Sequence, residues 1–190
     1  MKKSTSNTMS VIKNKTFKQL LWVGMGSIAM FFAGLTSAYI VRKAEGNWTD
    51  FILPEWFWYS TLTIVLSSAL LFVVKYKIKK NQSVSALLFS VFVLGLLFAY
   101  SQLNGWKELV SQGVFLTGEG SNVAGSFLYV ITLSHLAHLI GGLVALLITV
   151  INAMKGRYSA VNYLGVELAS IYWHFLSVLW IYLFCFLKYL

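Results

Sequence analysis

Long apolar stretches alternate with short polar connections along almost the whole chain. Each stretch is close to the ~20 residues that an α-helix needs to cross the hydrocarbon core of a bilayer. The pattern therefore predicts an all-α, polytopic membrane helix bundle with five transmembrane helices. A polar amino-terminal segment, 1–19, precedes a transmembrane domain, 20–190. The predicted spans are about 20–41, 56–74, 84–103, 127–151 and 165–187.

The connections give the expected orientation. Eleven Lys and Arg residues lie in the amino-terminal segment and in the second and fourth connections, against four on the opposite side. Cytoplasmic segments carry the excess of basic residues in membrane proteins. We therefore expect the amino terminus in the cytoplasm.

Composition agrees with a membrane protein. Hydrophobic residues make up 58% of the chain and charged residues 11%. The net charge of +9 comes from short basic runs at the ends of apolar stretches, which is a topology pattern and not a nucleic-acid-binding face. The single cysteine, Cys185, excludes an intrachain disulfide and a thiolate metal cluster.

Ionisable residues inside the last stretch are the first candidates for function. Glu167 and His174 are seven residues, or two helical turns, apart, and Ser170 and Ser177 extend the same face. Such a face is costly against lipid, so we expect it to contact protein or water. Glu167 either pairs at headgroup level with a basic residue of the preceding loop, Lys155 or Arg157, or is buried and acts in proton relay or lipid binding.

All three histidines lie inside predicted spans. His135 and His138 share one helix face, and His138 and His174 fall at similar depths. One hypothesis is axial ligation of a haem b by His138 and His174. The alternative, which we favour, is that each neutral imidazole forms hydrogen bonds between helices. The sequence does not predict a zinc site at His135 and His138, because no third Cys, Asp or Glu ligand lies at suitable spacing.

Small residues recur four apart in the first span. This spacing allows close approach of a neighbouring helix, and the length of the stretch argues against a cleaved signal peptide. In the connection 104–126, apolar residues predict a short helix along the membrane interface. The candidates for a subunit interface in the first span are Ala29, Ala33, Gly34, Ser37 and Ala38.

Several segments resemble one family, in the family's order. Residues 30–39, MFFAGLTSAY, resemble the third helix of cytochrome c oxidase subunit III, and GVFLTG at 113–118 with GSFLY at 125–129 resembles its long loop and next helix. HLAHLIGG at 135–142 is similar to its histidine–glycine segment, and Glu167 through YWHF at 172–175 to Trp180 is similar to its last helix. The number of spans matches the five-helix bacterial type. Ile28 departs from the pattern, because the family often has a carboxylate there.

The resemblance implies a non-catalytic integral subunit of a respiratory haem–copper terminal oxidase in the bacterial inner membrane. In that family haem and copper belong to subunits I and II, and this chain would hold neither. Subunit III packs on subunit I, holds phospholipid and supports proton uptake and complex stability; a larger respiratory supercomplex is a further candidate partner. Two alternatives are a subunit-III-like accessory protein of a nitric oxide reductase system and a stand-alone haem b cytochrome. The structural or lipid-contact candidates are Glu167, His174, His138, His135 and Trp173.

Overall fold

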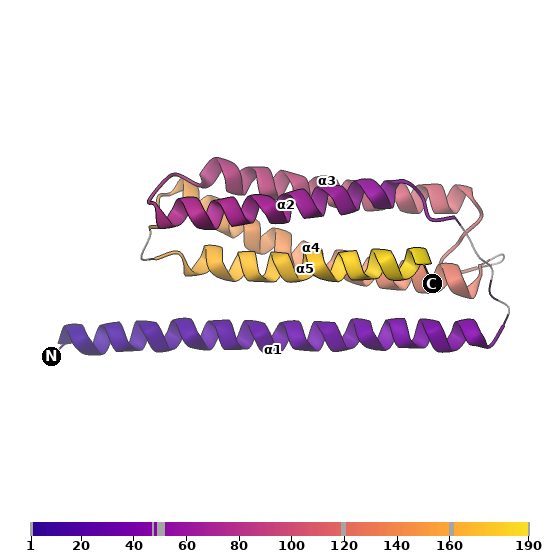
Figure 1. The fold of residues 1–190 in the computed structure, drawn as a ribbon, viewed down its shortest axis with the longest axis horizontal. Helices are drawn as coiled ribbons and strands as arrows, with labels where there is room; N and C mark the ends of the chain where they lie inside the picture. Colours follow the sequence, from indigo (N-terminus) through magenta and orange to yellow (C-terminus); the bar gives the residue numbers. More distant parts are fainter. Residues whose placement is uncertain (1, 47, 49–51, 119–120, 160–161, 190) are drawn as a thin grey trace.

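Figure 1 shows five long helices that run side by side in the computed structural model. The structure describes residues 2–46, 48, 52–118, 121–159 and 162–189, with side chains from residue 14 onward, and these ranges contain no strand. All five helices are long and apolar enough to span a membrane, as the hydropathy pattern predicts. The helices are α1 (Lys2–Ala44), α2 (Trp56–Lys79), α3 (Ser85–Ser111), α4 (Val123–Met154) and α5 (Leu164–Tyr189).

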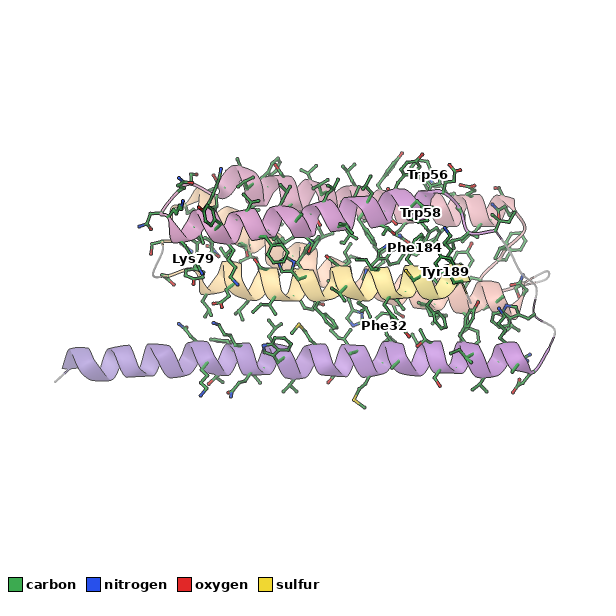
Figure 2. The ribbon with its side chains drawn as sticks, in the orientation of Figure 1. Phe32, Trp56, Trp58, Lys79, Phe184 and Tyr189 are labelled. Atoms are coloured by element: carbon green, nitrogen blue, oxygen red, sulfur yellow. The ribbon has the colours of Figure 1, made fainter. Side chains whose placement is uncertain are left out.

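Four of the helices form a closed ring. α2 packs on α3, α3 on α4, α4 on α5 and α5 on α2, while α1 lies against α4 and α5 (Figure 1). The first turns of α1 extend past the end of the other helices. Figure 2 shows Lys79 at one end of the ring and the aromatic side chains of Trp56, Trp58 and Tyr189 at the other. Basic and aromatic residues at opposite ends are typical of helices anchored at both membrane interfaces.

α1 contacts the ring through a seven-residue repeat. The seam residues are alternately three and four positions apart, so they all lie on the side of α1 that faces the neighbouring helices. The opposite side of α1 is exposed. The buried or half-buried seam consists of Lys18, Leu21, Met25, Ile28, Phe32, Leu35 and Tyr39.

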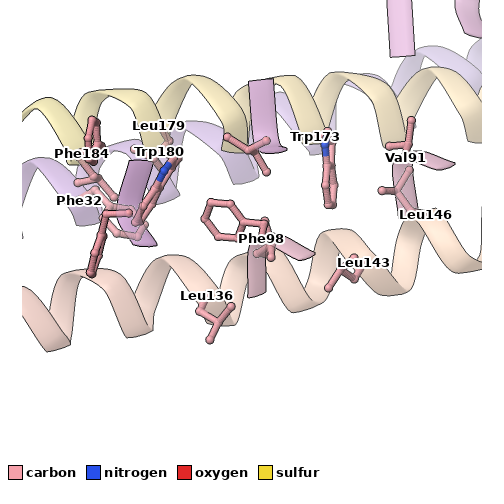
Figure 3. Close-up of a cluster of buried hydrophobic side chains, with 14 of the residues drawn as sticks. Phe32, Val91, Phe98, Leu136, Leu143, Leu146, Trp173, Leu179, Trp180 and Phe184 are labelled. Atoms are coloured by element: carbon pink, nitrogen blue, oxygen red, sulfur yellow. The ribbon is translucent and has the colours of Figure 1, made fainter. Parts of the chain in front are cut away.

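Trp173 on α5 is fully buried at the centre of the ring (Figure 3). Its indole N–H donates to the Ser67 hydroxyl of α2 at 2.8 Å. A Cβ atom added at Gly95 of α3 would lie 2.7 Å from this indole, and one added at Gly142 of α4 would lie 3.2 Å from it. The two glycines therefore make room for one of the two fully buried tryptophans of the core.

The helix ends differ from the sequence prediction most clearly in α1 and α3. Residues 2–19 of the polar segment are continuous with the first span, because α1 is helical from Lys2. The predicted interfacial helix in 104–126 is wrong: α3 continues to Ser111, and residues 112–118 and 121–122 are not helical. α3 does not end near Asn104, because helical backbone hydrogen bonds continue to Gln112. The Gln112 N–H donates to the Glu108 carbonyl at 3.0 Å.

Candidate functional site

Glu167 in the first turn of α5 forms an ion pair with α1. Its Oε1 accepts from the Lys18 Nζ at 2.7 Å, although the two residues are 149 positions apart. The predicted partner was in the loop before α5, but Arg157 of that loop donates to Asn152 Oδ1 at 3.1 Å. The pairing with Lys18 follows from the seam of α1, which places that lysine beside the start of α5.

His174, two turns along α5, bonds to α2. Its Nδ1 lies 2.5 Å from the Ser68 hydroxyl, and its ring stacks on Phe72 with centroids 4.3 Å apart. The two serines of the same predicted face bond within their own helix: Ser170 donates to the Val166 carbonyl and Ser177 to the Trp173 carbonyl. Of the predicted face, Glu167 and His174 therefore reach other helices.

His138 on α4 lies toward α1. Its Nδ1 is 2.7 Å from the Ser134 carbonyl of its own helix, and its ring packs at 5.7 Å from Phe32 of α1. The Tyr172 hydroxyl of α5 donates to the His138 carbonyl at 3.2 Å. His138 thus packs on α1 while His174 bonds to α2, so the geometry gives no support to the two as axial ligands of one haem. Within the described residues no group of three or more metal-ligating side chains could hold an ion.

His135 is fully buried among aromatic rings. Its ring centroid lies 5.0 Å from Trp180, 5.8 Å from Phe98 and 6.3 Å from Phe32. It belongs to the core and not to a surface site.

A groove runs between α1, α4 and α5 beside the ion pair. Its volume is about 470 Å³, and its lining is mainly apolar, with Leu21 from α1, Ala145 from α4 and Leu168 and Tyr172 from α5. A smaller polar cavity of about 150 Å³ contains Lys18 and Glu167 with neighbouring asparagines. Because Leu21 and Leu168 follow Lys18 and Glu167 along their helices, the polar cavity adjoins the apolar groove.

The small residues of α1 lie on its exposed side, away from the ring. A Cβ atom added at Gly34 would meet no atom within 4 Å. The packing of this chain therefore does not require a glycine there. The five predicted interface residues, Ala29, Ala33, Gly34, Ser37 and Ala38, are all exposed.

Comparison with known proteins identifies the family. The profile of cytochrome c oxidase subunit III matches residues 60–190, which include almost all of the α2–α5 ring. The chain belongs to the cytochrome c oxidase subunit III family. It is similar to a probable cytochrome c oxidase subunit 3 of Nocardia farcinica, with 28% identity over 87% of this chain and 82% of that protein. A subunit 3 of Thermostichus vulcanus is 28% identical over 86% and 82%, and a probable one of Rickettsia prowazekii is 32% identical over 67% and 45%.

Membership of this family makes the chain a subunit III of a haem–copper oxidase and a multi-pass protein of the bacterial plasma membrane, in agreement with its five apolar helices. Subunits III of this family carry no redox cofactor of their own.

Three residues of the polar contacts were not among the candidate site residues predicted from the sequence. Lys18 and Ser68 are ordinary in their local context, and only the packing of α1 and α2 on α5 gives them partners. Gln102 carried a usable signal, because an amide inside an apolar stretch must find a partner there. It is buried in α3 and donates to the Ser60 hydroxyl.

Proposed function

We propose that this chain acts as the non-catalytic subunit III of an aerobic respiratory oxidase: it packs on subunit I, holds phospholipid, and supports proton uptake and stability of the complex. The family match over the helix ring carries this proposal. Haem and copper of the complex belong to subunits I and II in this account.

An affinity tag on the chain, purified from its native membrane in mild detergent, tests the proposal. We expect a haem–copper catalytic subunit in the purified material by mass spectrometry. Recovery with a nitric oxide reductase instead would favour the accessory-protein alternative. A Soret band in the isolated chain that disappears in His138→Ala or His174→Ala would favour the haem b cytochrome.

The exposed side of α1 is the proposed contact with subunit I. Small side chains allow two helices to approach closely, and here they face away from the protein's own ring. Gly34→Leu should therefore fold but lose most of its association with subunit I, because the added side chain separates the helices.

Ser90→Leu is the matched control for that variant. Ser90 is also small and exposed, on α3, where we place no partner. Co-purified subunit I is measured for both variants; equal recovery with Gly34→Leu and with the unmodified chain would refute this contact.

The groove between α1, α4 and α5 is the proposed lipid site. A polar cavity with a lysine at one end and an apolar groove beyond it match the headgroup and acyl chain of a phospholipid. Leu21→Trp should fill the groove and lower the number of phospholipids retained per purified complex. Leu62→Trp, at an exposed position of α2, is the control; unchanged lipid content in Leu21→Trp would contradict the assignment.

A further inference from the structure

Two polar side chains in the centre of the ring carry atoms without a protein partner. His135 is fully buried, and among the described residues neither of its ring nitrogens has a hydrogen-bond partner. Gln102 is 1% exposed. Its Nε2 donates to the Ser60 hydroxyl at 2.8 Å, whereas its Oε1 has no partner in the described part of the chain.

These two side chains lie at the same level of adjacent helices. Phe98, one turn before Gln102 on α3, packs at 5.8 Å from the His135 ring. Trp106, one turn after Gln102, donates to the Thr132 hydroxyl at 3.1 Å. Gln102 therefore lies opposite the turn of α4 that runs from Thr132 to His135.

The neighbouring polar groups are already engaged. The Trp180 indole lies 5.0 Å from the His135 ring, but its N–H donates to the Thr61 hydroxyl at 2.9 Å. The Thr132 hydroxyl donates to a backbone carbonyl of its own helix at 2.8 Å. The other two rings packed on His135 belong to Phe32 and Phe98. Among the residues that the structure describes, these atoms therefore have no hydrogen-bond partner.

A neutral imidazole has one donor and one acceptor nitrogen, and an amide oxygen is an acceptor. Buried polar groups almost always have partners, and buried water commonly supplies them, with about three hydrogen bonds per molecule. We propose that Gln102 and His135 form an internal water site, in which a water molecule donates to Gln102 Oε1 and bonds to one imidazole nitrogen.

Through Ser60, Gln102 and His135, this water connects α2, α3 and α4 at the centre of the ring. It is an internal bridge between helices and is independent of the proposed contacts with lipid and subunit I.

A density map of the purified native complex at about 2 Å resolution tests the site directly. The proposal predicts a water peak within hydrogen-bonding distance of both Gln102 Oε1 and a His135 nitrogen. A direct bond between the two side chains would overturn the proposal. So would an empty site in a map that resolves other buried waters.

A double-mutant cycle gives a second test. Gln102→Met or His135→Leu alone removes one protein partner of the water and leaves the other side chain poorly hydrogen-bonded. Each variant should therefore lower the apparent melting temperature of the complex by several degrees. The double variant removes both polar groups that the water would bind. Its melting temperature should fall by much less than the sum of the two single decreases, because the two side chains are coupled through the water.

Thr149→Val is the control for this cycle. Thr149 is buried in the same helix and donates to the Ala145 carbonyl, and it lies about 20 Å along α4 from His135. Its shift should add to that of His135→Leu. Additive shifts for Gln102→Met with His135→Leu would overturn the bridge. If a variant does not accumulate, the density of the native complex decides.

Discussion

The Lys18–Glu167 ion pair connects the least buried helix to the ring. Only 17% of an apolar 18-residue stretch of α1 is buried in the protein, against 56% of such a stretch of α5. We expect Glu167→Gln to leave assembly intact but to loosen α1, so that phospholipid retention falls and the turnover lifetime of the complex shortens.

The magnitude follows from exposure. The side chains of Lys18 and Glu167 are 38% and 23% exposed, and ion pairs of this kind contribute about 0.2–1 kcal/mol. For a chain of this size such a loss lowers the melting temperature by at most about 4 °C. If lipid content or turnover lifetime falls by more than this small destabilisation can explain, the cause is a change in the groove and not unfolding of the chain.

The assay compares phospholipids per complex by mass spectrometry and the decay of oxygen consumption during turnover. The charge swap Lys18→Glu with Glu167→Lys should restore both, because the ion pair is rebuilt. Arg42→Gln is the matched control, since it breaks the Arg42–Glu45 pair, of 2.9 Å, at the end of α1 without separating two helices. The reasoning is refuted if Glu167→Gln keeps normal lipid content and lifetime, or if Arg42→Gln has the same effect.

Three further predictions concern the core and the orientation. Gly95→Ala places a Cβ atom 2.7 Å from the Trp173 indole and 2.8 Å from Leu143; thermal scans should show a cost of about 1–3 kcal/mol, and a near-neutral result would contradict the packing. Ser67→Ala removes the acceptor of the buried Trp173 N–H and should cost about 1–3 kcal/mol in the same assay, whereas the exposed Ser90→Ala should be close to neutral. In a Cys185→Ser background, a membrane-impermeant maleimide should label Ser121→Cys in intact cells and Ser83→Cys only after permeabilisation; the reverse pattern would show the opposite orientation.

Hydropathy alone predicts the five helices, because each must satisfy its backbone inside the bilayer. It does not predict where a helix ends in water. α1 begins at Lys2, within a polar segment, and α3 continues past Trp106 to Ser111, beyond its apolar stretch. Periodicity likewise gives the face of a residue but not the helix that covers it.

The candidate site shows the same division. The sequence indicates that Glu167 and His174 need partners, yet those partners, Lys18 and Ser68, lie on α1 and α2 and become neighbours only through the order of packing around α5. The similar depths of His138 and His174 are compatible with ligation of one haem by both. Only the packing shows that the two side chains contact different helices. The role of Gly95 depends on the indole of Trp173, 78 positions away in the sequence, and cannot be predicted from its own stretch.

The central claim is that the chain supports an oxidase without carrying out its chemistry. The most direct measurement compares the purified complex with and without this chain, for haem and copper content, initial oxygen consumption and the decay of activity during turnover. We predict unchanged haem and copper per catalytic subunit and a largely retained initial rate, with faster loss of activity in the depleted complex. Loss of stoichiometric haem with the chain, or equal lifetimes of the two preparations, would contradict the account.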